Sequence, residues 1–499
     1  MVALSRSCLV SAQAMEQVES TIFAGGLPVE ALMEKAGLRL VQAIERDFAL
    51  SRYSRIGVLV GPGHNGGDAL VVARELLLAG RTVFAYCPRT PAKPLTASHL
   101  RYFQSLGGSV SEGEALDGQA DLWIDGLFGF GLTRPVTSPY AQIIDRINAS
   151  GEPIAAIDLP SGLSSDGAVL GTAIRARRTY CLGLWKRGLW QDAALPYLGS
   201  AERLDLGIRD SQIQMPIAEH LLLPEMARSY LPLSRPPLAY KYSVGTVLAI
   251  AGSHQYSGAP LLVALGARAG GPGMLYLAVP ESLPQRLSPE LPEAIFYPCP
   301  EAANGTIADL PLDLGKFDAV VCGPGLGKID PKLVERVVGE TKGALLLDAD
   351  ALNVLADGLL AALTSRRAPT VLTPHAGEFK RLFGDIDLGD RLTAASEAAR
   401  RSGAWIVLKG ARSVVASPEG SVWVNTGGSS ALARGGSGDV LSGLAGALLA
   451  QSHNETQKAM LAAVWWHAAA GEWLAGQHTV LGVDPRTLAL GLLPFLVAS

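Results

Sequence analysis

Short apolar runs alternate with longer helical patterns along most of the chain. The apolar runs cover residues 56–60, 82–86, 121–125, 153–158 and 179–183, then 246–251, 274–279, 318–322, 344–348, 370–373 and 405–409. Such alternation of β-branched runs with helical segments is typical of a parallel α/β sheet. Two helical stretches, 439–450 and 457–475, close the pattern. We therefore expect an α/β fold in both halves.

The alternation lapses near residue 221, where a stretch of the chain carries four prolines before a new strand begins. Irregular, proline-rich segments commonly join domains. The sequence predicts a first domain at 1–215, a linker at 216–237 and a second domain at 238–499. The two halves share no repeated sequence period, so we expect two different α/β domains.

Composition narrows the class of protein. The chain has 42 Lys and Arg against 46 Asp and Glu, and this net charge of -4 provides no positive field for nucleic acid or an anionic membrane. No apolar run reaches the length of a membrane-spanning helix. Five scattered cysteines without a Cys-x-x-Cys pair predict a reducing, cytoplasmic compartment and no zinc site. We expect a loop-rich enzyme that acts on small molecules and forms a homo-oligomer.

A glycine-rich segment at 61–68, GPGHNGGD, follows the first predicted strand and precedes a helical run at 69–78. Backbone N–H groups at such strand-to-helix turns face a concavity suited to phosphate. A tight turn that binds nothing is the alternative. Asn65 and Asp68 favour a binding site, because packing alone does not require an amide and a carboxylate there.

Two later strands also end in oxygen-bearing side chains. Asp125 precedes GLFGFG at 126–131, and Asp158 precedes LPSG at 159–162, which contains Ser161. Either aspartate alone could cap a helix. Ligands of doubly wound sheets bind at the carboxyl ends of the strands, so three such ends favour one shared pocket. Asn65, Asp125 and Ser161 would offer hard oxygens suited to an alkali or alkaline-earth cation.

The motifs GPGxNGGD, DxxFGFG and DLPSG, with LMEKAG at 32–37, resemble the NAD(P)H-hydrate epimerase domain. The resemblance implies a Rossmann-like three-layer fold and exchange of the R and S epimers of NADH or NADPH hydrated at C6. It implies K⁺ ligands at Asn65, Asp125 and Ser161, and we take Asp158 as the candidate for acid–base assistance. The implied substrate contacts are His64, Asn65, Gly66, Gly67, Asp68, Gly129, Phe130, Gly131, Leu132, Thr133, Arg134, Pro135 and Asp158.

This chain departs from that family at two positions, having His64 where an asparagine is usual and Ala69 where a glycine is usual. Alanine would be strained at positive φ but not in a helix. Because Ala69 opens a helical run, we expect it to be helical and epimerase activity to be retained.

The second half carries RGGSGDVLSG at 434–443, directly before a long apolar helix, and NTGG at 425–428. Small residues and a helix N-terminus favour a bound anion. A carboxylate among those N–H groups would stay ionised and could accept a proton from a substrate hydroxyl. Asp439 is therefore the predicted catalytic base, and a simple partner of the helix dipole is the alternative.

Further motifs follow predicted strands in the same half: GPGLG at 323–327, DADALN at 348–353 and TPHAGE at 373–378. KGARS at 409–413 interrupts two strand-like runs. Because the residues just before Lys409 are apolar, we favour a lysine that contacts phosphate over a lysine in a solvated turn. His375, at a strand end, is a candidate participant although a lone histidine is often structural.

These motifs are similar to those of the ribokinase-like superfamily and, more closely, the ADP- or ATP-dependent NAD(P)H-hydrate dehydratases. The implied reaction phosphorylates the C6 hydroxyl of the S epimer and eliminates phosphate to restore the nicotinamide ring. It implies ADP over ATP, with Mg²⁺. The implied nucleotide contacts are Lys409, Gly410, Ala411, Arg412, Ser413 and Gly438; those to hydrated coenzyme are Ala259, Gly325, His375 and Asp439.

One departure from the dehydratase family pattern and one alternative function remain to be considered. The segment 267–273 differs from the usual Arg-x-Gly-Ala-Gly, which leaves the role of Arg268 unassigned. A ribokinase-like vitamin or sugar kinase fused to a non-catalytic nucleotide-binding module is the alternative function. A dehydrogenase is disfavoured because no acidic partner for the ribose is evident at the usual distance after the first loop.

Overall fold

The computed structural model describes residues 3–113, 119–452 and 455–498, and it divides into two compact units, Val2–Glu219 and His220–Ser499. The segment 216–237, expected as a linker, contains β10 (Glu219–Leu222) and α8 (Pro224–Ser229). Strand β10 is an edge strand of the sheet in the second unit. Burial of Leu221 and Leu222 explains why this segment is ordered.

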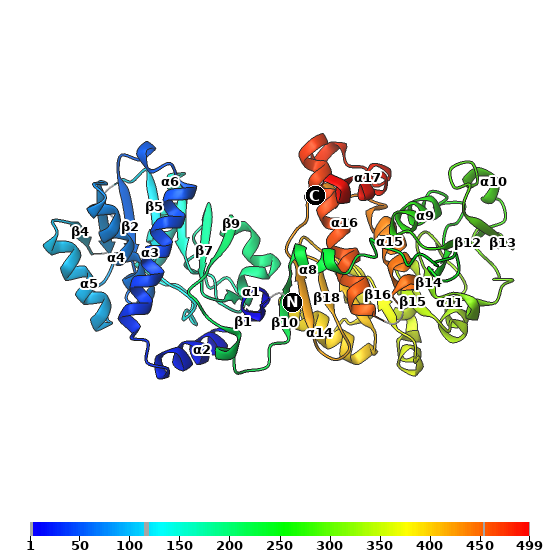
Figure 1. Cartoon of the computed structure of the whole chain (residues 1–499), viewed down its shortest axis with the longest axis horizontal. Helices are drawn as coiled ribbons and strands as arrows, with labels where there is room; N and C mark the ends of the chain where they lie inside the picture. The colour runs from blue at the N-terminus through cyan, green and yellow to red at the C-terminus, as the bar shows by residue number, and fades with distance from the viewer. Residues whose placement is uncertain (1–2, 114–118, 453–454, 499) are drawn as a thin grey trace. The chain divides into compact units, whose positions relative to one another are not determined.

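The first unit contains a seven-stranded sheet in the order β4-β3-β2-β5-β6-β7-β9, with every neighbouring pair parallel (Figure 1). Its strands are β2 (Ile56–Val60), β3 (Val83–Cys87), β4 (Ser109–Glu112), β5 (Leu122–Gly126), β6 (Ile154–Ile157), β7 (Arg178–Leu182) and β9 (Ser200–Leu204), and a separate pair joins β1 (Leu9–Val10) to β8 (Trp185–Lys186). Its helices are α1 (Leu4–Ser7), α2 (Ala12–Ala24), α3 (Val29–Asp47), α4 (His64–Leu78), α5 (Pro94–Ser105), α6 (Tyr140–Ser150) and α7 (Leu195–Leu198).

Alternate residues of these strands enter two separate cores. Val58 and Ile124 pack with residues of α3, α4 and α5, whereas Leu59 and Trp123 pack with the isoleucines of α6. A parallel sheet that is apolar on both faces requires helices on both faces. The α/β architecture of three layers expected for this half is therefore confirmed.

Strand order reverses between β2 and β5, which is where doubly wound folds bind ligands. The helix after β2 begins at His64, not at residue 69 as the sequence suggested, because Gly63 serves as its N-cap. The segment His64 to Asp68 is therefore the first helical turn and not a loop. Ala69 is helical, as expected, and its side chain is fully buried.

The second unit contains a ten-stranded sheet in the order β10-β19-β18-β17-β16-β15-β14-β11-β12-β13. Its remaining strands are β11 (Thr246–Ile250), β12 (Met274–Pro280), β13 (Ile295–Cys299), β14 (Ala319–Cys322), β15 (Ala344–Leu347), β16 (Thr370–Leu372), β17 (Trp405–Leu408), β18 (Val414–Ala416) and β19 (Val422–Asn425). Its remaining helices are α9 (Ala259–Gly270), α10 (Pro284–Leu287), α11 (Pro331–Glu340), α12 (Asp350–Val354), α13 (Ala376–Leu382), α14 (Arg391–Ser402), α15 (Ser437–Gln451), α16 (Thr456–His478) and α17 (Pro485–Ala498).

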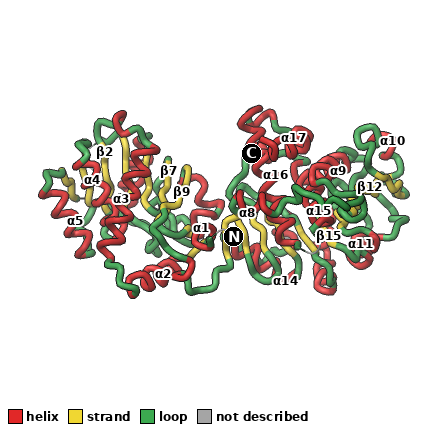
Figure 2. Tube along the Cα trace, in the orientation of Figure 1, coloured by secondary structure: helices red, strands yellow, loops and turns green. Residues whose placement is uncertain are grey.

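Strands β11 to β17 pair in parallel, and β17, β18 and β19 pair in antiparallel fashion. Figure 2 shows strands flanked by helices in this unit, as in the first. Helices α9 and α15 pack at very short range, because a Cβ on Gly443 would lie 1.8 Å from the Val263 carbonyl oxygen. Glycine at 443 is thus needed for helix packing. The strand order reverses between β11 and β14, which defines the second switch point.

Two sequence-level features can be checked directly. All five cysteines are buried and free. Within the ranges that the structure describes, no helix combines the length and apolarity needed to cross a membrane.

Candidate functional site

A cavity of about 610 Å³ lies at the switch point of the first unit. Its walls come from α2, α3, the start of α4, the loop after β5, and the ends of β6 and β8. It brings together most of the substrate contacts expected in this half: His64, Asn65, Asp68, Gly129, Phe130, Gly131, Leu132, Thr133, Arg134 and Asp158. Gly66, Gly67 and Pro135 do not line it.

Gly66 and Gly67 have packing roles. A Cβ on Gly66 would lie 2.1 Å from the Gly61 carbonyl oxygen, and one on Gly67 would lie 2.6 Å from the Met33 side chain. The backbone contact leaves no room for a larger residue at 66, whereas a larger residue at 67 would require the end of the Met33 side chain to move. The glycine pair therefore allows α4 to start tightly against β2 and α3.

Asp158 is held rigidly at the cavity wall. Its φ of 66° lies in the left-handed region, which is unusual for a residue with a side chain. Its Oδ1 accepts hydrogen bonds from Lys186 Nζ at 2.5 Å and Leu182 N at 3.2 Å, and its Oδ2 accepts one from Phe130 N at 3.1 Å. Strained, over-determined backbone of this kind is characteristic of functional sites.

The sequence analysis missed four charged residues at this cavity: Glu16 and Glu19 on α2, Lys93 before α5, and Lys186 on β8. Burial raises the pKa of Glu19 to about 7; Lys186 opposes this shift, and the Asp158 carboxylate adds to it. Burial and then Asp158 also raise the pKa of Asp68 well above its usual range. A lysine within the otherwise apolar run LGLWK was the available signal for Lys186.

The expected cation ligands Asp125 and Ser161 lie just outside the cavity lining. Ser161 Oγ donates to Asp125 Oδ1 at 2.7 Å, and Ser161 N donates to Asp125 Oδ2 at 2.8 Å. Burial raises the pKa of Asp125 to about 6. Ser161 Oγ also accepts a hydrogen bond from Phe128 N at 2.9 Å, which connects this pair to the cavity wall. Asn65 lies on the cavity side, beside Gly129.

The second unit gathers charged groups at the carboxyl ends of β15 and β17. Asp348 is buried, and its Oδ1 lies 2.8 Å from Lys409 Nζ while its Oδ2 accepts a hydrogen bond from Ser442 Oγ at 2.7 Å. Although burial opposes ionisation, these charge-assisted contacts lower the pKa of Asp348. Asp348 is therefore an ionised anchor that joins two strand ends to α15.

Asp439 lies in the first turn of α15. Burial, followed by the carboxylates of Asp348 and Asp350, raises its pKa to about 7, although Lys409 opposes the shift. Its neighbour Gly438 faces Lys409, because a Cβ there would lie 3.5 Å from Lys409 Nζ. A carboxyl group with a pKa near neutrality is suited to proton transfer at physiological pH.

The predicted nucleotide loop 409–413 connects β17 and β18 and is organised by a buried arginine. Arg391 Nη2 donates to the carbonyl oxygens of Leu408 at 3.1 Å, Lys409 at 3.3 Å and Arg412 at 3.5 Å. A Cβ on Gly410 would lie 2.3 Å from the same nitrogen. Arg412 is buried, Lys409 and Ser413 are half-buried, and Gly410 and Ala411 are the exposed members of the loop.

The expected coenzyme contacts are arranged in two places. A Cβ on Gly325 would lie 2.7 Å from the Ala259 Cβ, so these two residues adjoin at the β11 and β14 switch point. His375 pairs with Lys409 as an isolated parallel bridge. His375 Nδ1 accepts a hydrogen bond from Gly377 N at 2.9 Å and caps α13. Arg268, which the sequence left unassigned, pairs with Glu293 at 2.5 Å.

The folds and sites together define an enzyme with two α/β units, each carrying an aspartate that follows a strand and is paired with a lysine. Residues 29–188 match the family described as YjeF-related protein N-terminus. Residues 247–492 match the family described as NAD(P)H-hydrate dehydratase.

Several full-length relatives identify the particular family. The chain is 65% identical to the bifunctional NAD(P)H-hydrate repair enzyme Nnr of Gloeobacter violaceus over 98% of both chains. It is 48% identical to the enzyme of the same name from Synechocystis, over 97% of this chain and 94% of that one. A structure of the ADP/ATP-dependent NAD(P)H-hydrate dehydratase from Bacillus subtilis is 31% identical, covers 56% of this chain and 98% of its own, and has a TM-score of 0.48. The chain belongs to the bifunctional NAD(P)H-hydrate repair enzyme family.

Proposed function

We propose that this chain repairs hydrated NADH and NADPH in two steps. The first unit interconverts the R and S epimers, and the second unit dehydrates the S epimer at the expense of ADP. Full-length identity of 65% to a named bifunctional repair enzyme is the observation that carries this proposal. The enclosed cavity in the first unit and the near-neutral carboxyl group of Asp439 in the second support it.

In the first unit, a hydrated nicotinamide ring would occupy the cavity beside Asp158. Asn65, Asp125 and Ser161 fit a potassium ion, because they offer hard oxygens around a carboxylate that is fully buried. No lysine or arginine among the described residues lies within ion-pairing distance of Asp125. A bound cation would neutralise this carboxylate and hold the loop after β5 in place.

In the second unit, Asp439 would accept the proton of the C6 hydroxyl as that oxygen attacks the terminal phosphorus of ADP. Phosphorylation turns a poor leaving group into a good one, and loss of phosphate then restores the ring. Lys409 lies where it can offset phosphate charge without leaving Asp348. The N–H groups at the start of α15 would stabilise the same phosphate charge.

We propose that ADP is used as its Mg²⁺ complex. Proteins commonly hold Mg²⁺ through one or two carboxylates together with the phosphates of the substrate. Asp350 fits this role, because its carboxyl group lies near the proposed proton acceptor Asp439. Magnesium would supply charge neutralisation at the transferred phosphoryl group.

Incubation of the full-length chain with a mixture of R and S hydrates tests both steps. With ADP, NADH should be recovered from both epimers, whereas without nucleotide the epimers should exchange and no NADH should form. A parallel reaction with ATP tests the nucleotide preference. Accumulation of a stable phosphorylated product would instead support the kinase alternative. Replacing K⁺ by Na⁺ should slow only the exchange.

A further inference from the structure

Lys186 is buried within the first unit although it carries a charge, and it lines the cavity. Only 1% of its side chain is exposed. A buried ammonium group is costly unless it is paired. Here Asp158 is 2.5 Å away, and this attraction outweighs burial, so the pKa of Lys186 is raised. In the free protein Lys186 is therefore protonated, next to the expected substrate site.

The hydrogen bonds of Lys186 leave one N–H group for a ligand. An ammonium group has three donors. One donates to Asp158 Oδ1 and a second to the Leu182 carbonyl oxygen at 2.6 Å. The third has no acceptor among the described residues, while Nζ lies 5.5 Å from the centre of the Phe130 ring. Phe130 also lines the cavity, so the free donor belongs to the cavity wall.

A purely structural role does not account for the buried ion pair between Lys186 and Asp158. The backbone of Asp158 lies in the left-handed region, and three donors converge on its carboxylate. Arg203, in the same unit, shows how a partly buried cation serves structure, since its Nη1 donates to the Gly183 carbonyl oxygen at 2.8 Å and it does not line the cavity. Lys186 differs because it is paired with the candidate acid–base residue.

We propose that Lys186 is a catalytic residue of the first unit and that its third N–H donates to the C6 hydroxyl oxygen of the hydrated ring. This inference rests on the proposed epimerase function. As the C6–O bond breaks, the oxygen keeps the bonding electrons and takes a proton from Lys186, leaving as water. The N1 lone pair forms the second bond to C6. Water then adds to the opposite face, and its proton returns to Lys186 through Asp158.

The test uses the full-length chain and hydrated NADH, with R-to-S exchange followed by chromatography in the absence of nucleotide. Lys186→Met should lower kcat for exchange about 100-fold, which is the usual contribution of a positioned proton donor, and leave KM within about threefold. Dehydration of the S epimer with ADP should be unchanged. Arg203→Met is the matched control and should exchange the epimers at the wild-type rate.

Two more variants separate proton transfer from folding. Lys186→Ala should be rescued about tenfold by methylammonium in a saturable manner, because the small cation can occupy the vacated space beside Asp158. Lys186→Arg keeps the charge, and hence the fold, but moves the donor, so its kcat should fall about tenfold.

The outcomes that overturn the proposal are distinct from failure of the proposed function. A wild-type chain without exchange activity contradicts the epimerase function itself. An active wild type contradicts the role of Lys186 if Lys186→Met keeps kcat within about threefold, if Arg203→Met loses as much activity, or if methylammonium restores nothing. An unchanged kcat in Lys186→Arg also overturns it.

Discussion

The two units each pair a lysine with an aspartate at a strand end, but they expose the pair differently. Lys186 and Asp158 are both buried, at 1% and 3% side-chain exposure, whereas Lys409 is 21% exposed against an Asp348 at 2%. A fully enclosed pair suits proton exchange on a small ring. A half-open lysine suits a charged phosphate that must enter and leave. We propose that this difference in burial adapts the same kind of ion pair to two chemistries.

The second carboxyl group of each site extends the comparison. Glu19 and Asp439 both have a pKa raised to about 7, chiefly by burial. In the first unit this group is on α2, a helix that precedes the strands of the main sheet. In the second unit it is in the first turn of α15, where we expect the phosphate to bind. Each site therefore has an aspartate paired with a lysine and a nearby carboxyl group whose pKa burial raises to about 7.

The largest expected effect comes from Asp439→Asn, which separates the two sites. Removing the base should lower kcat for ADP-dependent dehydration about 10³-fold, because the C6 hydroxyl loses its proton acceptor. Exchange of the epimers should be unaffected. Asp318→Asn is the control. Asp318 lies just before β14, and its carboxylate accepts hydrogen bonds from the backbone and side chain of Thr246. Loss of both activities in Asp439→Asn would contradict independent sites.

The pH dependence of dehydration should follow Asp439. A base acts only when ionised, so a raised pKa of about 7 places the loss of activity on the acid side of neutrality. We expect kcat/KM for dehydration to fall about tenfold per pH unit below that value and to level off above it. The Asp439→Asn residual rate should lack this inflection. A wild-type profile that is flat across neutrality would exclude Asp439 as the titrating base.

A smaller effect is expected when the nucleotide loop loses its support. Arg391→Met should raise KM for ADP about tenfold, because the loop carbonyls at 408, 409 and 412 lose their common donor. Arg366→Met is a matched control, since Arg366 donates to the carbonyl oxygens of Val338 at 2.7 Å and Thr341 at 2.8 Å, away from this loop. Equal effects of the two variants on KM would show that Arg391 is only structural.

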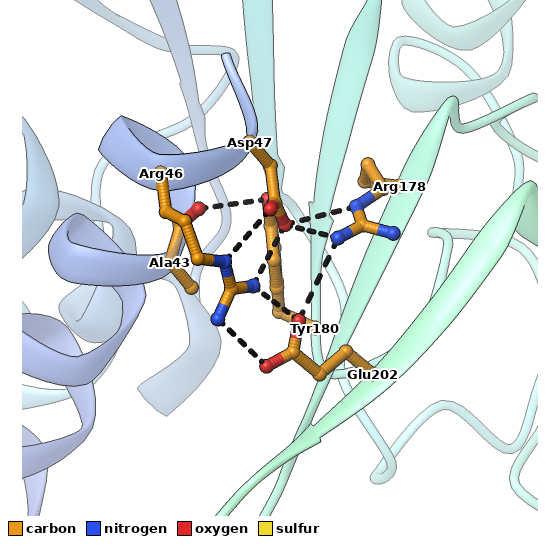
Figure 3. Close-up of polar contacts among 6 residues, drawn as sticks. All are labelled: Ala43, Arg46, Asp47, Arg178, Tyr180 and Glu202. Carbon is orange, nitrogen blue, oxygen red and sulfur yellow. Dashed lines mark hydrogen bonds and ion pairs between the residues drawn. The ribbon is translucent and has the colours of Figure 1, made fainter.

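The smallest effect should come from a charge cluster outside both sites, formed by Arg46, Asp47, Arg178, Tyr180 and Glu202 (Figure 3). Asp47 Oδ2 accepts hydrogen bonds from Arg178 Nε at 2.9 Å and Tyr180 Oη at 3.0 Å, and these contacts, together with Arg46, lower the pKa of Asp47. Asp47→Asn should destabilise the first unit by about 1 to 2 kcal/mol in urea unfolding. Both activities should persist at low temperature.

The sign of the pH effect at Asp47 follows from that lowered pKa. Its contribution to stability is fully present above the unfolded pKa of about 4 and is lost as pH falls towards the folded value. The difference in unfolding free energy between wild type and Asp47→Asn should therefore shrink on acidification. A difference that grows as pH falls would contradict the ion-pair role.

Much of each fold could be predicted because its signal is local. The run at 56–60 coincides with β2, and the runs at 246–251 and 405–409 overlap β11 and β17 closely. Buried parallel strands produce continuous apolar runs that a single sequence reveals. The edge strands β4, β10 and β13 were missed, because partly exposed edge strands lack that pattern.

The sites were predictable only in part. Strand-end motifs located Asp158 and Lys409, and a glycine-rich segment at a helix start located Asp439. The start of α4 at His64 was not evident, because glycines in a first helical turn resemble a loop. Glu19 and Lys186 carry no motif of their own, and their importance depends on what surrounds them.

The sequence by itself determined the two α/β units, the order of the strand-end motifs and the family to which the chain belongs. Only the tertiary structure decided which charged groups meet. Asp158 and Lys186 are 28 residues apart, and Asp348 and Lys409 are 61 apart, so neither ion pair is visible locally. Burial of an ionisable group and the distance to its counter-charge depend on the packed sheet, and together they set its pKa and its chemistry.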